Sequence, residues 1–292
     1  MFSKQKVFYH SEYPFKSNFI DINGHKMHFI DEGTGDKTVL LIHSGFGWSY
    51  FYRKLIRQLS GDCRVIAPDL VGYGLSEKPR DFDYRIEDHV SCIEQFVEAL
   101  KLKNVTLVTH GWGTTFGFGY ATQHYGNIRR LVVLDGVTFI VPLVFGFWLL
   151  GRIYLVGFAL TRLSNLFLKH FMNKHAKDLA AETKANYLFP YDSYDNRIAI
   201  QKFIQDIPVA RWHCSWMTIL HIQRRIHFLK QLPVYIVWGR KSKLFGKGVH
   251  SKWRKYLPQA KYAKFTNSHF FMLEKPESDA FKYVKDVILE RQ

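Results

Sequence analysis

The most specific chemical signal in this sequence surrounds Gly111, in the segment THGWG at residues 109–113. The residues from Asn104 onward predict a buried strand, and the pattern at 114–125 predicts a helix. A strand, a tight turn with small residues and a helix together form the element that holds an enzyme nucleophile at the edge of a sheet. The middle residue of such a turn is normally Ser, Asp or Cys. Glycine has no side chain to attack a substrate, so the pattern predicts an enzyme scaffold without its first chemical group.

The elements around this turn must place it at a sheet edge. Apolar runs predict strands, and apolar residues three to four positions apart predict helices. Predicted strands cover residues 19–22, 26–30, 38–43, 63–68, 104–110, 130–135, 233–239 and 261–266, and predicted helices cover 48–59, 86–100, 114–125 and 276–290. Strands that alternate with helices form an α/β fold, with a mostly parallel sheet and helices on both faces.

This alternation stops after Asp135 and resumes at Pro233. The residues between them are helical in pattern, aromatic and irregular. We therefore expect a core domain made of residues 1–136 and 228–292, with a helical cap domain at 137–227 inserted between two strands. In open α/β sheets, ligands bind at the carboxyl ends of the strands, where such a cap would lie.

Part of the cap, residues 137–160, is apolar over a length that reaches that of a membrane span and carries one charge, Arg152. Pro142 and three glycines interrupt the segment. Three interpretations stay open: a pair of cap helices packed on the core, a peripheral membrane contact or lipid-entry surface, and a spanning helix. The last is disfavoured because it would cut one sheet in two.

The composition excludes several classes of protein. The 292 residues are 47% hydrophobic and 23% charged, which is typical of a globular chain and not of a disordered one. The net charge of +16 comes from scattered Lys and Arg, without a repeated basic and aromatic module. We therefore expect no nucleic-acid partner, and weak attraction to anionic lipid fits the charge better.

The cysteines and glycines give no sign of a metal or organic cofactor. Cys63, Cys92 and Cys214 lack the spacing of a zinc site or a disulfide framework, which indicates a reducing compartment. Gly72-Tyr-Gly74 lacks the rest of a dinucleotide fingerprint. The first residues contain no apolar core of signal-peptide length. We therefore expect a cytoplasmic protein, with membrane association as an open alternative, and the oligomeric state is not indicated.

Several stretches together resemble the α/β-hydrolase superfamily, and more closely its haloalkane dehalogenase and epoxide hydrolase branch. They are residues 43–53, 64–79, 84–90, 110–113, 189–192 and 267–276. The likeness runs from about Asn18 to Leu289. It implies an α/β-hydrolase fold with an inserted helical cap and a hydrophobic small-molecule substrate or ligand.

The resemblance implies a role for each matching residue. His269 corresponds to the base that activates water, and Gly111 corresponds to the position where this branch carries an Asp nucleophile. The usual acid after Trp238-Gly239 is replaced by Ser242. Asp135, which ends a predicted strand, could then be the acid that orients His269, or simply a polar residue at the strand end.

The resemblance also implies an oxyanion hole. Gly45 and Trp112 would offer backbone N–H groups to a developing oxyanion, and the neighbouring Phe46 and Trp48 would line the substrate site. Trp112 also matches a residue that donates its indole N–H to halide in the dehalogenases, and it could equally be a bulky floor of the pocket. Ser44 places a hydroxyl near the site. It lies on the loop at residues 43–47, here called the oxyanion loop, and not on the turn at residues 109–113, here called the elbow.

Three hypotheses for function follow. The leading one is a hydrolase-type catalyst in which a dyad of His269 and Asp135 acts as a general base that removes a proton from water or from the substrate. The substrate would be a lactone, an ester or an activated C–H acid. The second is a pseudoenzyme that binds a hydrophobic ligand or partner under its cap. The third is a dehalogenase-like hydrolase inactivated by an Asp-to-Gly change at Gly111.

Overall fold

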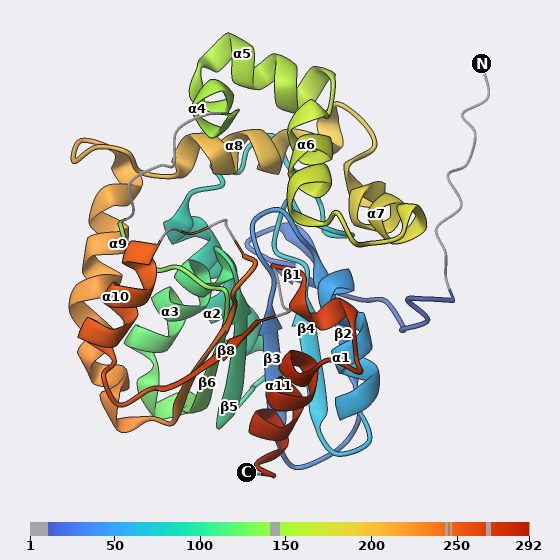
Figure 1. Cartoon of the computed structure of the whole chain (residues 1–292). Helices are drawn as coiled ribbons and strands as arrows, with labels where there is room; N and C mark the ends of the chain where they lie inside the picture. Colours follow the sequence, from blue (N-terminus) through green and yellow to red (C-terminus); the bar gives the residue numbers. More distant parts are fainter. Residues whose placement is uncertain (1–10, 141–146, 243–244, 246, 267–269, 292) are drawn as a thin grey trace.

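The computed structural model describes residues 11–140, 147–242, 245, 247–266 and 270–291. Eight strands form one sheet in the order β1-β2-β4-β3-β5-β6-β7-β8 (Figure 1). The strands are β1 (Asn18–Ile22), β2 (His25–Glu32), β3 (Thr38–Ile42), β4 (Arg64–Pro68), β5 (Val105–His110), β6 (Ile128–Leu134), β7 (Val234–Gly239) and β8 (Lys261–Phe265). β2 pairs antiparallel with β1 and β4, and the other pairs are parallel. The predicted mostly parallel sheet is confirmed.

The central strands are buried because helices cover both faces of the sheet. Every residue of β5 and β7 is buried, as expected for parallel strands covered on both sides. The register pairs Ile42 with Thr109 and His110 with Leu134. The carboxyl ends of β3, β5 and β6 therefore lie side by side, and this edge carries the candidate site.

Five helices pack on the sheet: α1 (Arg53–Leu59), α2 (Ile86–Ala99), α3 (Gly113–Gln123), α10 (Lys247–Tyr256) and α11 (Asp279–Leu289). α1 contacts α11, and α2 contacts α3. The sequence analysis did not predict α10, because basic residues dominate its sequence. Val249, Trp253 and Leu257 are nevertheless buried at intervals of four residues, which gives the helix one apolar face.

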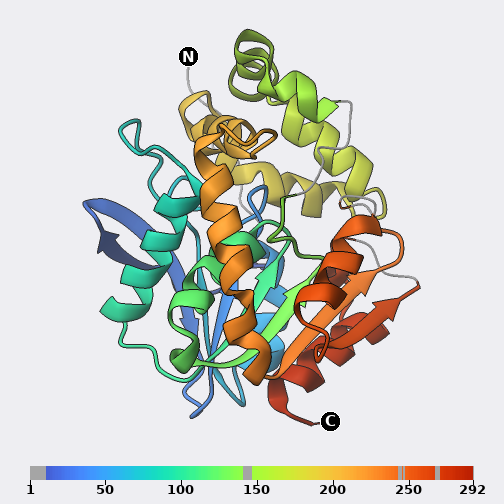
Figure 2. The same cartoon turned by 90° about the vertical axis from the view of Figure 1, so that its left-hand side faces the viewer.

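The cap consists of helices above the carboxyl ends of the strands (Figure 1). They are α4 (Phe147–Arg152), α5 (Tyr154–Phe158), α6 (Leu166–His175), α7 (Ala181–Leu188), α8 (Ile198–Asp206) and α9 (Cys214–Arg225). Shorter turns of helix are η1 (Ser49–Tyr52), η2 (Tyr125–Asn127), η3 (Ala159–Leu163), η4 (Phe189–Tyr191), η5 (Asp195–Arg197), η6 (Ile226–Gln231) and η7 (Met272–Glu274). Figure 2 shows α9 running down alongside α3, so this last helix packs on the core.

The part of the apolar segment that the structure describes at residues 147–160 does not form one long helix. α4 ends at Arg152, Ile153 is extended, and α5 begins at Tyr154. No helix in the described part of the chain has the length and apolarity that crossing a membrane requires.

Candidate active site

The predicted strand, turn and helix around Gly111 are confirmed. β5 ends at His110 and α3 begins at Gly113. Gly111 has a φ of +55°, in the left-handed region that glycine adopts without strain. Its N–H donates to the Leu134 carbonyl at 3.1 Å, and its carbonyl accepts from the N–H of Thr114 at 3.3 Å and of Val137 at 3.1 Å. These hydrogen bonds fix the turn at the carboxyl edge of the sheet.

The space above Gly111 is filled by two side chains from other loops. A Cβ at this position would lie 2.5 Å from the Oγ of Ser44 and 3.0 Å from the Cζ of Phe270. Ser44 is 2% exposed, and its hydroxyl has no hydrogen-bond partner among the described residues. A polar group therefore does stand at the bare elbow, but it comes from the loop after β3. Ser44 was predicted to lie near the site but not on the turn, and the parallel pairing of β3 with β5 brings it against Gly111.

The predicted oxyanion donors flank this hydroxyl. Neither the Gly45 N–H nor the Trp112 N–H is hydrogen-bonded to another described residue. Trp112 immediately precedes α3, so its amide lies at the positive end of the helix dipole. A Cβ at Gly45 would lie 2.6 Å from the Cζ of Phe203 on α8, so only glycine lets this cap helix approach the loop. Ser44, Gly45 and Trp112 thus bring to the elbow a hydroxyl and two amides that have no partner among the described residues.

Aromatic rings surround these polar groups. Phe46 contacts three rings of the cap, at centroid distances of 5.7 Å to Phe167, 5.0 Å to Phe171 and 5.0 Å to Phe203. The Trp112 ring lies 5.8 Å from that of Phe203. The cap phenylalanines could not be predicted, because nothing in the irregular insertion shows which of them face the core. The surroundings of the elbow are therefore mainly apolar.

Trp48 lies in another cluster of rings. It stacks on Tyr50 with centroids 5.3 Å apart, and its ring centroid lies 5.1 Å from that of Tyr13. These contacts tie the oxyanion loop to the segment before β1. A contact of Trp48 with substrate stays a prediction.

Asp135 follows β6 in a left-handed conformation, with a φ of +42°. The side chain is fully buried, and its Oδ1 accepts from the Gly239 N–H at 3.1 Å. Its Oδ2 has no hydrogen-bond partner in the described residues. Burial raises the pKa of Asp135 well above its usual range, and the Gly239 N–H and the Ser242 hydroxyl oppose the shift only in part. His269 lies outside the described residues, so the predicted dyad stays a prediction.

His110 anchors the loop that carries Phe270. Its Nε2 donates to the Phe270 carbonyl at 2.9 Å, and its ring stacks on Phe51 at a centroid distance of 3.9 Å. Burial lowers the pKa of His110 to about 3, so the imidazole is neutral. The role of this histidine is therefore to position the loop over Gly111.

A buried ion pair holds the other end of that loop. The guanidinium of Arg53 donates to both carboxylate oxygens of Glu274, at 2.6 Å and 2.8 Å. The hydroxyl of Tyr187 on α7 donates to the same carboxylate. α1, the loop and the cap are thus joined at one charged group.

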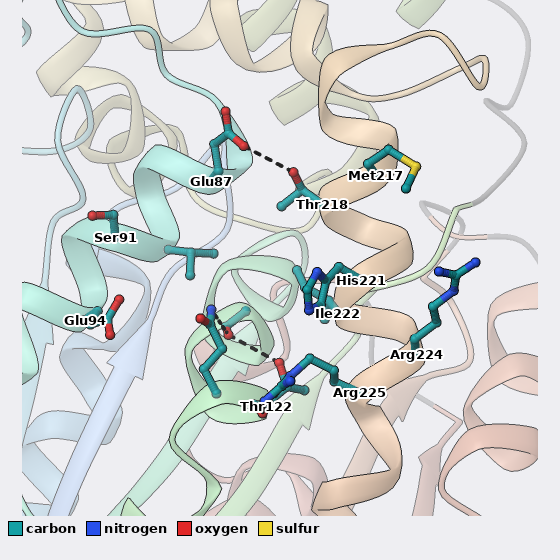
Figure 3. A pocket seen from close by; sticks show the side chains of 13 residues that line it. Glu87, Ser91, Glu94, Thr122, Met217, Thr218, His221, Ile222, Arg224 and Arg225 are labelled. Carbon is teal, nitrogen blue, oxygen red and sulfur yellow. Dashed lines mark hydrogen bonds between the residues drawn. The ribbon is translucent and has the colours of Figure 1, made fainter.

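A separate cavity of about 640 Å³ lies between α2, α3 and α9 (Figure 3). Glu87 and Glu94 of α2 face one side of it, and His221 and Arg225 of α9 face the other. Neither Gly111 nor any residue of the oxyanion loop lines this cavity. It is therefore distinct from the candidate active site.

One group of potential metal ligands exists among the described residues, formed by Asp206, His213 and Cys214. Their ligating atoms lie within 4.8 Å of one another. The Nδ1 of His213 accepts from the Ser215 N–H at 3.2 Å, and Asp206 accepts from the Ser215 hydroxyl and from the Ile86 N–H. Asp206 and His213 thus cap the starts of α2 and α9, and these hydrogen bonds give the two side chains a structural role.

Residues 37–276 match the model of a protein family described as alpha/beta hydrolase fold. The chain belongs to this family. A cis-3-alkyl-4-alkyloxetan-2-one decarboxylase of Shewanella oneidensis is 31% identical over 96% of this chain and 90% of its own length. An enzyme of the same name from Xanthomonas campestris pv. campestris is 30% identical over 90% of this chain and 92% of its own length.

Haloalkane dehalogenases match a shorter part of this chain in sequence. The enzyme of Mycobacterium marinum is 40% identical, over 42% of this chain and 44% of its own length. Among solved structures, the haloalkane dehalogenase DatA from Agrobacterium tumefaciens C58 aligns with a TM-score of 0.84 and 23% identity, covering 94% of this chain and 96% of that one. The structural likeness confirms the α/β-hydrolase fold.

Proposed function

We propose that this protein decarboxylates a cis-3-alkyl-4-alkyloxetan-2-one, a four-membered lactone, to an alkene and carbon dioxide. Two relatives of that name match this chain over at least nine-tenths of it, whereas the likeness to the Mycobacterium marinum dehalogenase covers 42%. The apolar rings around the elbow suit the two alkyl groups of such a lactone.

The bare elbow is the observation that carries the proposal. Hydrolysis of a haloalkane requires a group that displaces the halide, and Gly111 cannot supply one. Loss of carbon dioxide from an oxetan-2-one consumes no such group. The bond between C4 and O1 breaks with its electrons on oxygen, and the C2–C3 bond breaks to give the C3–C4 double bond. The O1 electrons complete carbon dioxide, so neither protein nor water contributes an atom.

The polar groups at the elbow fit the charge that develops in this fragmentation. Negative charge grows on the carboxyl oxygens as the C4–O1 bond lengthens. The N–H groups of Gly45 and Trp112 and the hydroxyl of Ser44 are donors without partners among the described residues. Donors that are preorganised and shielded from water stabilise such charge most strongly.

The rings fit the need to keep water out. Positive character grows on C4 as its bond to O1 lengthens. The ring tips of Phe203 and Phe270 lie against Gly45 and Gly111 respectively, beside the polar donors. Apolar rings exclude water, which would otherwise trap C4 and give a hydroxy acid.

The test is incubation of the purified protein with a synthetic cis-3,4-dialkyl oxetan-2-one. We expect the corresponding alkene and carbon dioxide, measured by gas chromatography, together with an unmodified intact mass of the protein. A 3-hydroxy acid as the product would instead indicate hydrolysis by the His269 and Asp135 dyad. That outcome, or no turnover, would overturn the proposal.

A further inference from the structure

The outer edge of the cap exposes a row of apolar side chains, which we term the cap ridge. It consists of Leu149, Leu150, Ile153, Tyr154, Leu155, Val156, Leu163 and Leu166. Tyr154 is 70% exposed and Leu155 is 74% exposed. In Figure 1, α4 and α5 stand at the end of the molecule that is farthest from the sheet.

This exposure is concentrated in one place. Of the fourteen large apolar side chains that are exposed in the described part of the chain, eight belong to the ridge. A helix that rests on a core buries every third or fourth residue, but the only buried residue of α5 is Gly157. Contiguous apolar surface of this kind marks an interaction site in soluble proteins.

The segment that carries the ridge is basic, although two exposed acids of another cap segment lie near it: Asp195 pairs with Arg162, and Asp192 lines the same pocket as Leu163 and Lys169. Residues 147–177 contain five Lys or Arg and no Asp or Glu. Arg152 and Arg162 are engaged inside the cap, where they donate to the carbonyls of Ile204 and Tyr194. Lys169 and Lys174 on α6 are exposed and make no ion pair with a described residue. An apolar ridge flanked by unpaired cations complements a bilayer that carries anionic headgroups.

We propose that the cap ridge is a peripheral docking surface for an anionic lipid bilayer. Leu155 and Tyr154 enter the interface between headgroups and acyl chains, and Lys169 and Lys174 contact the headgroups. The ridge continues directly into the site, because Leu166 of α6 points outward while its neighbour Phe167 is buried against Phe46. Docking through the ridge thus places the cap, together with the elbow beneath it, next to the lipid.

The experiment is co-sedimentation of the full chain with two kinds of vesicle, one of phosphatidylcholine alone and one with phosphatidylglycerol added. We expect binding to the second kind, weakened by salt because the lysine contribution is screened. Leu155→Glu and Tyr154→Glu should each lower the affinity by on the order of tenfold, since a carboxylate replaces a side chain that enters the apolar layer. Lys169→Glu with Lys174→Glu should weaken binding and remove most of its salt dependence.

Phe19→Glu is the matched control. Phe19 is 47% exposed on β1 in the core, so the same charge change there should leave binding unchanged. The ridge variants alter exposed side chains, and circular dichroism would check that they are folded. Failure of the wild type to bind either vesicle, or equal binding by Leu155→Glu, would overturn the proposal. So would a concentration-dependent dimer without vesicle binding, abolished by Leu155→Glu, which would identify a second copy as the occupant.

Discussion

The hydroxyl of Ser44 lies only 2.5 Å from the point where a Cβ on Gly111 would stand. The glycine and the serine are therefore matched: the loop after β3 occupies the volume that an elbow side chain would need. This relationship bears directly on the hypothesis that a single Asp-to-Gly change inactivated a dehalogenase. It indicates that the surroundings of Gly111 are adapted to the absence of a side chain.

Gly111→Asp should therefore destabilise the protein without creating a dehalogenase. The new Cβ would overlap Ser44 Oγ and crowd Phe270, and overpacking of this kind costs about 1–3 kcal/mol. The double variant with Ser44→Gly should recover much of that loss, because the closest overlap is removed. Urea unfolding of both variants measures the effect, with Ser44→Gly alone as the control. Halide release from a haloalkane by the single variant would show that one substitution separates this chain from a dehalogenase.

Ser44→Ala should lower kcat for decarboxylation about 100-fold with little change in KM, since the hydroxyl donates to charge that exists only in the transition state. Its stability should be unchanged or slightly higher, because a buried hydroxyl without a described partner is removed. Tyr73→Phe, which also removes a buried hydroxyl of this kind, is the control and should keep full activity. If the wild type decarboxylates and Ser44→Ala does so at the same rate, Ser44 has no part in the chemistry.

Asp135→Asn should make the protein more stable than the wild type as the pH rises. The raised pKa of Asp135 means that the folded state holds the proton more tightly than the unfolded state. The resulting stability is fully present below the usual Asp pKa and declines as the pH rises toward the raised value, by about 1.4 kcal/mol per pH unit. Asparagine keeps the acceptor for the Gly239 N–H and has no proton to lose as the pH rises. Thermal melts across pH 4 to about 8 would check this.

The same variant separates two mechanisms. If Asp135 is protonated, Asp135→Asn keeps both the fold and decarboxylation. If Asp135 is ionised beside a charged His269, the variant leaves that cation unpaired, and both stability and any hydrolytic activity fall.

Glu274→Gln should be destabilising by about 3 kcal/mol, because it removes the buried counter-charge of Arg53 and leaves the guanidinium with Glu12, a partly exposed carboxylate at 3.3 Å. The loss should appear in activity as well, since this carboxylate holds the loop that carries Phe270. Arg129→Gln is the control, because it breaks a partly exposed ion pair with Glu290 and should cost about 1 kcal/mol or less. Similar melting temperatures for the two variants would show that the buried pair does not anchor the loop.

The sequence predicted the sheet and the elbow well, because both depend on local patterns. Apolar runs such as β5 are continuous, and the glycine at position 111 satisfies a positive φ that the turn requires. α10 escaped prediction because its buried residues Val249 and Trp253, and Leu257 just after it, are spaced through a basic stretch. The strands and the elbow could be predicted because they depend on residues that are near one another in the chain.

The interior of the site could not be predicted in the same way. The approach of Ser44 to Gly111 depends on the parallel pairing of β3 with β5, and on a loop geometry that no periodicity encodes. The contribution of Phe203 depends on how α8 lies over the oxyanion loop. The details of this site therefore depend on contacts between segments that are distant in the sequence, and local patterns do not predict such contacts.

The carbonyl of Gly111 accepts a hydrogen bond from Val137, the first residue of the inserted segment. The residue at which the insertion leaves the core is thus hydrogen-bonded to the elbow itself. Any residue except proline supplies such an N–H, so an exchanged cap should keep this bond as long as its first residue is not proline and follows the same backbone path.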